Sequence, residues 1–306
     1  MGKTENGDRR VALLGVPTSA GSHNAGQEQA PAALRAAGLV ARLQATGLEV
    51  CDFADLPVER HRPAERENGV RDLARVVDVA RRTAGEVARL CAAGYWPLVL
   101  GGDCTITLGV LAGVLRHHHD AGLMYVDGDA DLNTPQGSES GVLDTMGVTH
   151  LLGGGAPALS GIGPTHPLVT ADRLELFGFD PEELDTGQWL QVAALGLHAT
   201  PAPVVRLDPA ARAADALGRM ETAAGSFLVH FDVDVLDTGR FPLANFPHFG
   251  GLGLDEVTVC LEQFCRSPRC AGLVLTEVNP DHDPDDELVD QLVAAVCVAL
   301  APRQHT

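Results

Sequence analysis

Short apolar runs alternate with helix-like stretches along most of this chain, and the alternation restricts the folds that it can adopt. Strands are expected in the runs 10–17, 48–56, 96–103, 121–129, 156–163, 174–180, 202–208, 226–237 and 270–280. Helices are expected at 29–47, 70–94, 105–119, 211–224, 254–267 and 286–301, and near the end of 144–154. Parallel strands need a crossover between them, which is usually a helix. The order therefore predicts the α/β class: a three-layer α/β/α fold with a mostly parallel central sheet.

The composition is that of a folded and acidic protein. Hydrophobic residues make up 45% of the 306 residues, which excludes an intrinsically disordered chain. The formal net charge of −19 argues against nucleic acid or an anionic membrane as a partner. Seven cysteines occur without a CxxC pair, and no membrane span or signal peptide is evident, so we expect a cytoplasmic protein. We expect one domain over residues 1–306, with residues 1–9 disordered.

Carboxylates gather where two of the expected strands end. Asp127, Asp129 and Asp131 follow one apolar run, and Asp232 and Asp234 close another. Side chains two residues apart on a strand share a face, so the carboxylates of each group lie together. One member of each group can instead cap the turn that follows. If the two strands are adjacent, the acids need cations, and two divalent ions can neutralise them and activate a water. We therefore predict a binuclear metal centre at the carboxyl edge of the sheet.

Four motifs occur in the order and at the spacing of a known family. They are "GGDCT" at 101–105, "DGDAD" at 127–131, "HFDVDVLDT" at 230–238 and "TEVNP" at 276–280. Over residues 11–300 the chain resembles the arginase/agmatinase/formiminoglutamase family, the ureohydrolases, whose motifs read "GGDHS", "DAHxD", "SxDxDxxDP" and a Glu before "NP". The resemblance implies an arginase-like fold, two Mn²⁺ ions or another divalent metal, and a trimer or hexamer of identical chains. It also implies hydrolysis of a guanidino C–N bond by a hydroxide that bridges the metals.

The resemblance assigns roles to individual residues. Asp127 and Asp232 correspond to ligands that bridge both ions, while Asp131 completes one metal site and Asp234 the other. Glu277 corresponds to the carboxylate that faces the guanidinium of the substrate.

Two metal-binding histidines of the family are replaced in this chain. Cys104 occupies the position of one histidine and Asp129 the position of the other, and both side chains can bind metal. Four aspartates balance two divalent ions, Asp129 adds a fifth negative charge, and a Cys104 thiolate would add a sixth. A protonated acid, a strongly cationic substrate or occupancy by one metal would relieve the excess. We expect Asp129 to be a ligand. Cys104 is either a ligand that draws its half of the site towards Zn²⁺ or Fe²⁺, or a buried inert thiol.

The loop after the second motif resembles the family segment "DxNTPxTxxSGNxHG", which implies substrate contacts from Asn133 and Ser140. The proton-shuttling His of that segment falls on Asp144, and its substrate-binding Asn falls on Val142. His248 is a candidate to replace the missing shuttle. Weaker candidates are His23, His150 and His198.

The segments that would select a substrate also depart from the family. The stretch "VAALGLHATPAPV" at 192–204 shows no match to the acidic segment that grips the α-amino group in arginases. Phe241, Phe246 and Phe249 would lie near the mouth of the site and line an apolar pocket, or else belong to the core or an interface. Free arginine is therefore not the expected substrate.

The predicted function is a metal-dependent hydrolase that cleaves a guanidino or amidine C–N bond of a small linear amidine. One alternative keeps the metal and changes the bond to that of a formimino group or an amide. Another is a catalytically impaired homologue with a regulatory or assembly role. Retention of the four motif aspartates and Glu277 argues against the latter, because buried carboxylates without a role are costly.

Overall fold

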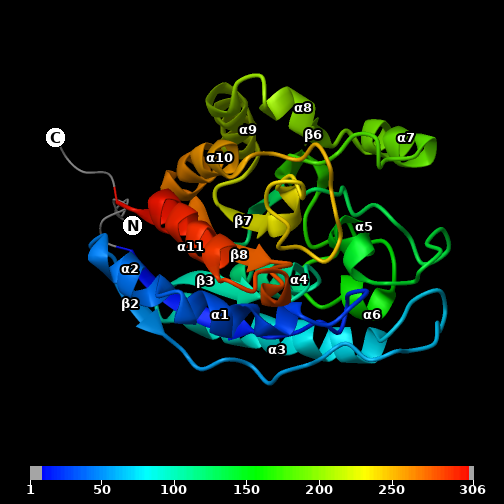
Figure 1. Ribbon diagram of the computed structural model, residues 1–306. Helices are drawn as coiled ribbons and strands as arrows, with labels where there is room; N and C mark the ends of the chain where they lie inside the picture. The colour runs from blue at the N-terminus through cyan, green and yellow to red at the C-terminus, as the bar shows by residue number, and fades with distance from the viewer. Residues whose placement is uncertain (1–8, 303–306) are drawn as a thin grey trace.

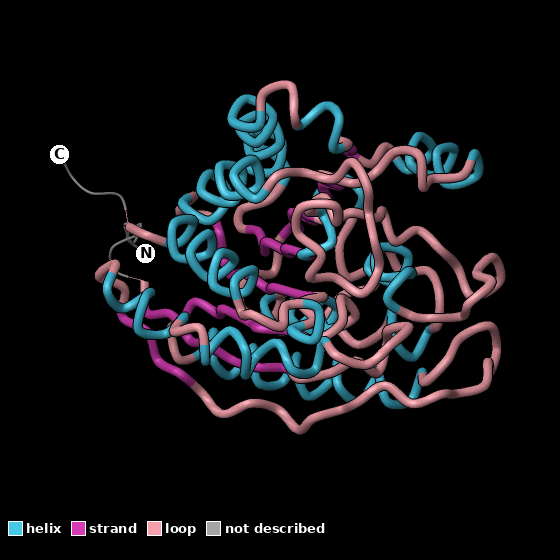
Figure 2. The backbone as a smooth tube through the Cα atoms, in the orientation of Figure 1, coloured by secondary structure: helices cyan, strands magenta, loops and turns pink. Residues whose placement is uncertain are grey.

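The computed structural model describes residues 9–302, which contain one sheet of eight strands (Figures 1 and 2). The spatial order is β2-β1-β3-β8-β7-β4-β5-β6, and every pairing within it is parallel. The strands are β1 (Arg10–Val16), β2 (Glu49–Asp52), β3 (Trp96–Gly101), β4 (Gly122–Val126), β5 (Leu174–Phe177), β6 (His198–Thr200), β7 (Phe227–Asp232) and β8 (Cys270–Thr276).

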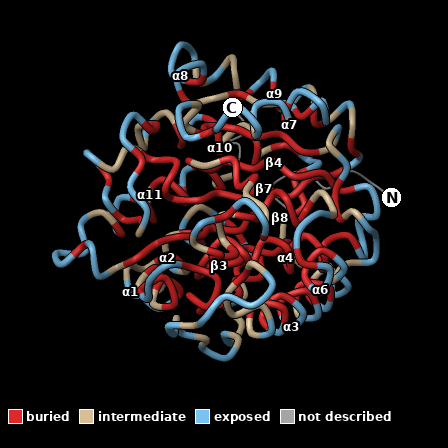
Figure 3. The backbone as a smooth tube through the Cα atoms, turned by 90° about the vertical axis from the view of Figure 1, so that its right-hand side faces the viewer, coloured by how far each residue is buried: buried red, intermediate tan, exposed pale blue. Residues whose placement is uncertain are grey.

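Helices cover both faces of the sheet, which confirms the predicted three layers (Figure 1). Strand β1 shows why: Val11 and Leu13 pack into one hydrophobic cluster, while Ala12 and Leu14 pack into the cluster on the opposite face. Figure 3 shows buried backbone in the centre, where the strands lie, and exposed stretches mainly on the outer helices and loops. The helices are α1 (Ala30–Ala36), α2 (Leu39–Ala45), α3 (Leu73–Ala92), α4 (Ile106–Val114), α5 (Gly147–Leu151), α6 (Pro157–Ser160), α7 (Thr186–Leu195), α8 (Ala202–Val205), α9 (Pro209–Ala223), α10 (Leu254–Arg266) and α11 (Glu287–Leu300).

Two of the predicted strands are wrong. The segment 156–163 contains the short helix α6, and 202–208 contains α8. Each helix carries a proline in its first turn, Pro157 or Pro203, where the missing N–H breaks no helical hydrogen bond. Apolar runs of this length do not distinguish a strand from a buried turn of helix.

The predicted helix at 29–47 is broken in two, and two elements were not expected. Gly38 separates α1 from α2 at φ 79°, a left-handed conformation that glycine adopts without steric cost. Helix α7 escapes the sequence pattern because its large apolar side chains Trp189 and Leu190 are exposed. Strand β6 has only three residues, too few for a periodic signal.

The predicted disorder of residues 1–9 falls mostly outside the described residues. Arg9 itself is described, and its guanidinium donates hydrogen bonds to the carbonyl oxygens of Cys265 and Ser267. This residue is therefore tied to the end of α10 rather than disordered. Within residues 9–302, no helix is long and apolar enough to cross a membrane.

The strand order places the acidic motifs side by side. Strands β3, β8, β7 and β4 are consecutive in the sheet, and the four motifs lie at their carboxyl ends. Because the strands are parallel, all four ends meet at one edge.

Candidate metal centre

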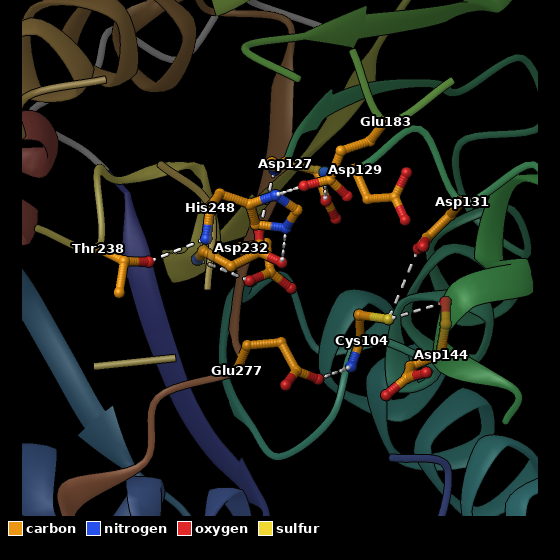
Figure 4. A network of polar contacts seen from close by, with 12 residues as sticks. Cys104, Asp127, Asp129, Asp131, Asp144, Glu183, Asp232, Thr238, His248 and Glu277 are labelled. Carbon is orange, nitrogen blue, oxygen red and sulfur yellow. Dashed lines mark hydrogen bonds and ion pairs between the residues drawn. The ribbon is translucent and has the colours of Figure 1, made fainter. Parts of the chain in front are cut away.

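The loops that follow these four strands enclose a narrow pocket at the carboxyl edge of the sheet. Its volume is about 60 Å³, enough for metal ions with a few waters or for one small planar group. Figure 4 shows acidic side chains from separate loops that point towards one another around it. The lining residues are His23, Cys104, Asp127, Asp129, Asp131, Asp144, Thr145, Asp232, Asp234, Phe246, His248 and Glu277.

Two aromatic side chains from the strands hold the acids that follow β4. The Tyr125 hydroxyl donates a hydrogen bond to Asp131 Oδ2. The His230 ring stacks on Tyr125 with centroids 4.1 Å apart, and its Nε2 lies 3.1 Å from Asp127 Oδ2. Burial lowers the pKa of His230 to about 3, so the ring is neutral. Thr107 Oγ1 lies 2.8 Å from Nδ1, and a proton donated there leaves Nε2–H to bind Asp127.

The acids that follow β7 are bound to both neighbouring loops. Thr276, at the end of β8, donates its hydroxyl proton to Asp232 Oδ2 at 2.9 Å. The Gly128 N–H donates to Asp234 Oδ1 at 2.9 Å, and the Asp234 N–H donates to Asp232 Oδ1 at 2.9 Å. These bonds orient the carboxylates of the second acidic motif against the first.

Cys104 and Glu277 meet on the side of the pocket formed by β3 and β8. The Cys104 N–H donates to Glu277 Oε1 at 2.9 Å, and Gln27 Nε2 donates to Glu277 Oε2 at 2.8 Å. The Cys104 thiol lies 3.3 Å from the carbonyl oxygen of Asp144 and 3.7 Å from Asp131 Oδ2. The sulfur thus lies among oxygen atoms of the pocket.

His248 forms the opposite side and connects two carboxylates. Its Nδ1 lies 2.6 Å from Glu183 Oε1 (Figure 4). Its Nε2 lies 3.3 Å from Asp234 Oδ2. The backbone N–H of His248 donates to Thr238 Oγ1 at 2.9 Å, which fixes the loop that carries it. The ring itself is buried, with 1% of the side chain exposed.

Backbone strain occurs at two of the pocket acids. Asp131 has φ 48° and Glu277 has φ 63°, both in the left-handed region that L-residues avoid. Strained conformations of this kind persist where surrounding contacts over-determine them, and they cluster at functional sites.

Burial raises the pKa of the pocket acids. The pKa values of Asp127, Asp131, Asp144 and Asp232 lie well above the usual range, first because of burial and then because neighbouring carboxylates repel the charge. Burial, with Asp103 next in importance, raises the pKa of Glu277 to about 8.

The pKa values of Asp129 and Asp234 differ from those of the other pocket acids. Burial raises the pKa of Asp129 only to about 6. Burial acts in the same direction on Asp234, but the nearby His248 outweighs it and lowers the pKa of this acid. Conversely, Asp234 and Glu183 overcome the effect of burial and raise the pKa of His248 to about 11.

The donor set of this pocket fits divalent metal ions. Ligand atoms of Cys104, Asp232 and Glu277 all lie within 4.8 Å of one another, as do those of Asp127, His230 and Asp232. So many buried acids cannot all ionise without compensating positive charge. Divalent cations at the shared Asp232 would supply that charge and let the carboxylates ionise.

The structure brings most of the predicted site residues together. All six proposed metal ligands line the pocket, together with Glu277, Asp144 and His248. Asn133 and Ser140 are outside the lining formed by the described residues, and the Ser140 hydroxyl instead accepts the Val142 N–H at 3.2 Å. Metal ligation and the individual roles stay predictions.

The other aromatic and histidine candidates differ in whether they line the pocket. Phe246 and His23 line the mouth, Phe249 is exposed, and Phe241 is buried away from the lining. His150 is buried, and its Nδ1 lies 2.8 Å from the carbonyl oxygen of Met146.

Two functional candidates were missed at the sequence level. Glu183 lies in the acidic run "DPEELD" at 180–185, in the loop between β5 and α7, and a run of acids in a loop that follows a strand is the signal that could have identified it. Gln27, which binds Glu277, is 250 residues away in sequence and gives no such signal. The acidic run at 180–185 lies upstream of the segment 192–204, on the other side of the start of α7.

A larger depression lies elsewhere on the surface. It has a volume of about 600 Å³, is lined partly by His198, Asp215 and Arg219, and is widely open to solvent. Arg219 is engaged with the buried Glu175. The depression lacks the convergent buried acids of the pocket at the carboxyl edge, which remains the candidate site.

Comparisons with known proteins agree with this geometry. The model of the arginase family matches residues 9–301. The chain is 32% identical to an arginase of Brevibacillus brevis over 295 residues, which cover 96% of each protein. The native structure of the Bacillus caldovelox arginase superposes with a TM-score of 0.87 at 27% identity, covering 97% of this chain and 100% of that one.

A more distant neighbour shares the fold. A formiminoglutamase variant of Trypanosoma cruzi, solved with Mn²⁺, has a TM-score of 0.76 at 20% identity and covers 97% of this chain and 95% of its own. The family match extends over nearly the whole chain and includes all four acidic motifs. This chain belongs to the arginase family of metal-binding hydrolases.

Proposed function

We propose that this protein hydrolyses a guanidino or amidine C–N bond of a small cationic molecule and that free arginine is a poor substrate. The convergence of Asp127, Asp131, Asp232 and Asp234 with Glu277 in one buried pocket is the observation that carries the proposal. Such a cluster has little use in a purely structural protein, because its acids must be neutralised to remain buried.

Asp127, Asp131, Asp232 and Asp234 would hold two divalent ions. When bound, the metal pair supplies Lewis acidity and lowers the pKa of a water for attack on the planar carbon. Mn²⁺ is the first candidate, because oxygen donors suit it and the T. cruzi neighbour was solved with this ion. Asp129 and Cys104 would complete the sites, and a Cys104 thiolate would favour a softer ion in its half.

Glu277 would orient the substrate cation. Both of its oxygens already accept one hydrogen bond, from Cys104 and Gln27, which fixes the plane of the carboxyl group. Each carboxylate oxygen can accept a second bond, so a guanidinium or amidinium can still pair with it. A cationic substrate would also keep Glu277 ionised, although its pKa is about 8 without one.

Asp144 would deliver a proton to the leaving amine. Its carboxyl group lines the pocket, and burial together with neighbouring carboxylates raises its pKa well above the usual range, which favours the protonated form. It stands where the family carries its proton-shuttling His. His248, the other proposed proton carrier, lies across the pocket with Nδ1 committed to Glu183.

The size of the pocket favours a small reacting group with its remainder outside. A volume of about 60 Å³ holds a guanidino or amidine head, and the rest of the substrate would pass Phe246 and His23 at the mouth. The predicted contacts from Asn133 and Ser140 would act on that outer part. Val142, which replaces the substrate-binding Asn, offers no polar side chain there.

The test is release of urea, formamide or ammonia from a panel of substrates by metal-loaded protein. The panel contains arginine, agmatine, guanidinobutyrate, guanidine, formiminoglutamate and guanidino compounds with apolar tails. We expect turnover of at least one guanidino compound and a kcat/KM for arginine lower by orders of magnitude than for the best one. Arginine as the best substrate would contradict the proposal. Preference for formiminoglutamate would support the alternative formimino hydrolase, and inactivity throughout would favour a regulatory or assembly role.

Two properties of the working protein belong to the same proposal. We expect it to act in the cytoplasm as a trimer or hexamer. Sedimentation of the metal-loaded protein tests the oligomer, and a monomer would contradict it.

A further inference from the structure

One ring nitrogen of His248 lacks a hydrogen-bond partner although it is buried. The atom is Nε2, which makes an ion pair with Asp234 but no hydrogen bond to any described residue. Asp234 Oδ2 is 3.3 Å away, yet the contact does not have the alignment of a hydrogen bond. A buried, unsatisfied nitrogen next to a buried carboxylate calls for an explanation.

The spacing of these two atoms fits two ligands of one metal ion. Ligands about 2.1 Å from a common ion are about 3.0 Å apart in octahedral geometry and about 3.4 Å apart in tetrahedral geometry. The Nε2 to Oδ2 distance of 3.3 Å lies between these values. Asp234 is itself one of the proposed ligands.

Glu183 supplies the second half of a metal-binding histidine arrangement. Histidines that bind metal through one nitrogen usually donate the other N–H to a carboxylate, which fixes the ring and its tautomer. His248 Nδ1 and Glu183 Oε1 are 2.6 Å apart, so this contact is short and strong. The contact with Glu183 leaves the other ring nitrogen, Nε2, facing Asp234.

Gly128 provides space for the ring. A Cβ at this position would lie 2.7 Å from His248 Cδ2 and 2.7 Å from the Asp234 carbonyl oxygen, which is too close for either. The family motif "DAHxD" has alanine at this position and histidine next to it, whereas this chain has Gly128 and Asp129. The loss of the neighbouring histidine thus coincides with a glycine that admits an imidazole from another loop.

We propose that His248, oriented by Glu183, is a ligand of the metal ion that Asp234 would hold. The imidazole absent at position 129 is replaced from the loop after β7. This inference rests on the metal centre of the proposed function. Metal binding would displace the proton that Asp234 and Glu183 favour on this ring, and the neutral imidazole would then add a donor without adding to the excess of negative charge.

The experiment measures metal binding rather than activity. Mn²⁺ stoichiometry and affinity are determined by titration calorimetry and elemental analysis for the wild type and for His248→Ala. Electron spin echo modulation of bound Mn²⁺ detects coordinated ¹⁴N. We expect two ions in the wild type, and in His248→Ala an affinity at one site reduced at least about 100-fold, with loss of ¹⁴N modulation from that site.

Three further variants separate ligation from a general loss of structure. Glu183→Gln should weaken the same site about 10- to 100-fold, because it disturbs only the orientation of the ring. The double variant Asp129→His, His248→Ala should recover much of the lost affinity, because it returns an imidazole to position 129. His198→Ala, at an exposed histidine outside the pocket, should bind metal as the wild type does.

The outcomes distinguish this inference from the proposed function. A wild type that binds two ions, together with unchanged affinity in His248→Ala, would overturn the inference and leave the metal centre intact. If that variant kept both ions and lost activity, His248 would be a proton carrier instead. A wild type that binds no divalent ion would remove the metal centre and this inference with it.

Discussion

Glu277 accepts the backbone N–H of Cys104 at 2.9 Å, which joins the loop after β8 to the loop after β3 within the pocket. The same carboxyl group accepts a bond from Gln27, so two segments far away in the sequence hold it. Its strained backbone, with φ 63°, is maintained by this arrangement. Glu277 is therefore preorganised before any substrate arrives, which is what an orienting carboxylate requires.

Replacement of Glu277 by Gln should remove activity and preserve the metals. An amide cannot form the charge-assisted pair with a guanidinium, so we expect kcat/KM to fall about 10²- to 10⁴-fold on the best substrate. Metal stoichiometry, measured by elemental analysis, should stay at the wild-type value. Gln27→Ala is the matched control, and we expect it to have a smaller effect because it removes only one bond to the carboxyl group. Full activity of Glu277→Gln would disprove the orienting role.

Cys104 should influence which metal is preferred. Its sulfur belongs to a group of ligand atoms that includes Asp232 and Glu277, all within 4.8 Å. If it binds as a thiolate, Co²⁺-loaded protein should show a sulfur-to-metal charge-transfer band in the near ultraviolet. Cys104→Ser should abolish the band and shift preference from Zn²⁺ towards Mn²⁺. Cys260→Ser, at a buried thiol outside the pocket, should change neither. An unchanged spectrum in Cys104→Ser would identify an inert thiol.

Without metal, the protein should lose stability as pH rises. Folding raises the pKa of Asp129 to about 6 and that of Glu277 to about 8, chiefly through burial. A raised carboxyl pKa contributes stability that is complete below the unfolded value of about 4 and is lost as pH rises through the folded value. The melting temperature of the metal-free protein should therefore fall between about pH 5 and pH 9.

Metal should reverse this trend. Ions bind the deprotonated acids, so stabilisation by added Mn²⁺ should grow over the same pH interval. Differential scanning calorimetry at several pH values, with and without the ion, measures both effects. Metal-free protein that becomes more stable towards pH 9 would be inconsistent with the raised pKa values.

Phe246 should influence the outer part of the substrate. It lines the mouth of the pocket, and half of its surface is exposed, with a relative accessibility of 51%. Phe246→Ala should raise KM for guanidino compounds with apolar tails several-fold and leave guanidine itself nearly unchanged. Phe249→Ala, with 70% of its surface exposed, serves as the control outside the lining. Equal effects on tailed and tailless compounds would place Phe246 outside the substrate path.

The layers and the position of the pocket could both be predicted from the sequence, because both follow from a parallel sheet. Alternating apolar runs and helices require a parallel sheet, and the acidic motifs follow strands that become neighbours in it. The organisation as one domain stays a prediction. The segments at 156–163 and 202–208 were assigned wrongly because their apolar runs are too short for the spacing of apolar residues to distinguish a strand from a helix.

Contacts across long sequence separations could not be predicted in this way. Gln27 meets Glu277, and Glu183 meets His248 65 residues away, only because the chain folds. Tyr125 and His230 read as ordinary strand residues, although their stacked rings bind Asp131 and Asp127. Periodicity identifies which face a residue occupies, but it carries no information about its partner across the sheet.

The metal content of purified protein tests the central claim most directly. Elemental analysis after mild purification and Mn²⁺ add-back should find about two divalent ions per chain in the wild type. Asp127→Asn and Asp232→Asn should lose them, because each removes a proposed metal-binding carboxylate, while Asp215→Asn, at an exposed residue of α9, should retain them. Wild-type protein without bound metal, and without any rise in melting temperature on addition of Mn²⁺, Zn²⁺ or Fe²⁺, would contradict the metal centre.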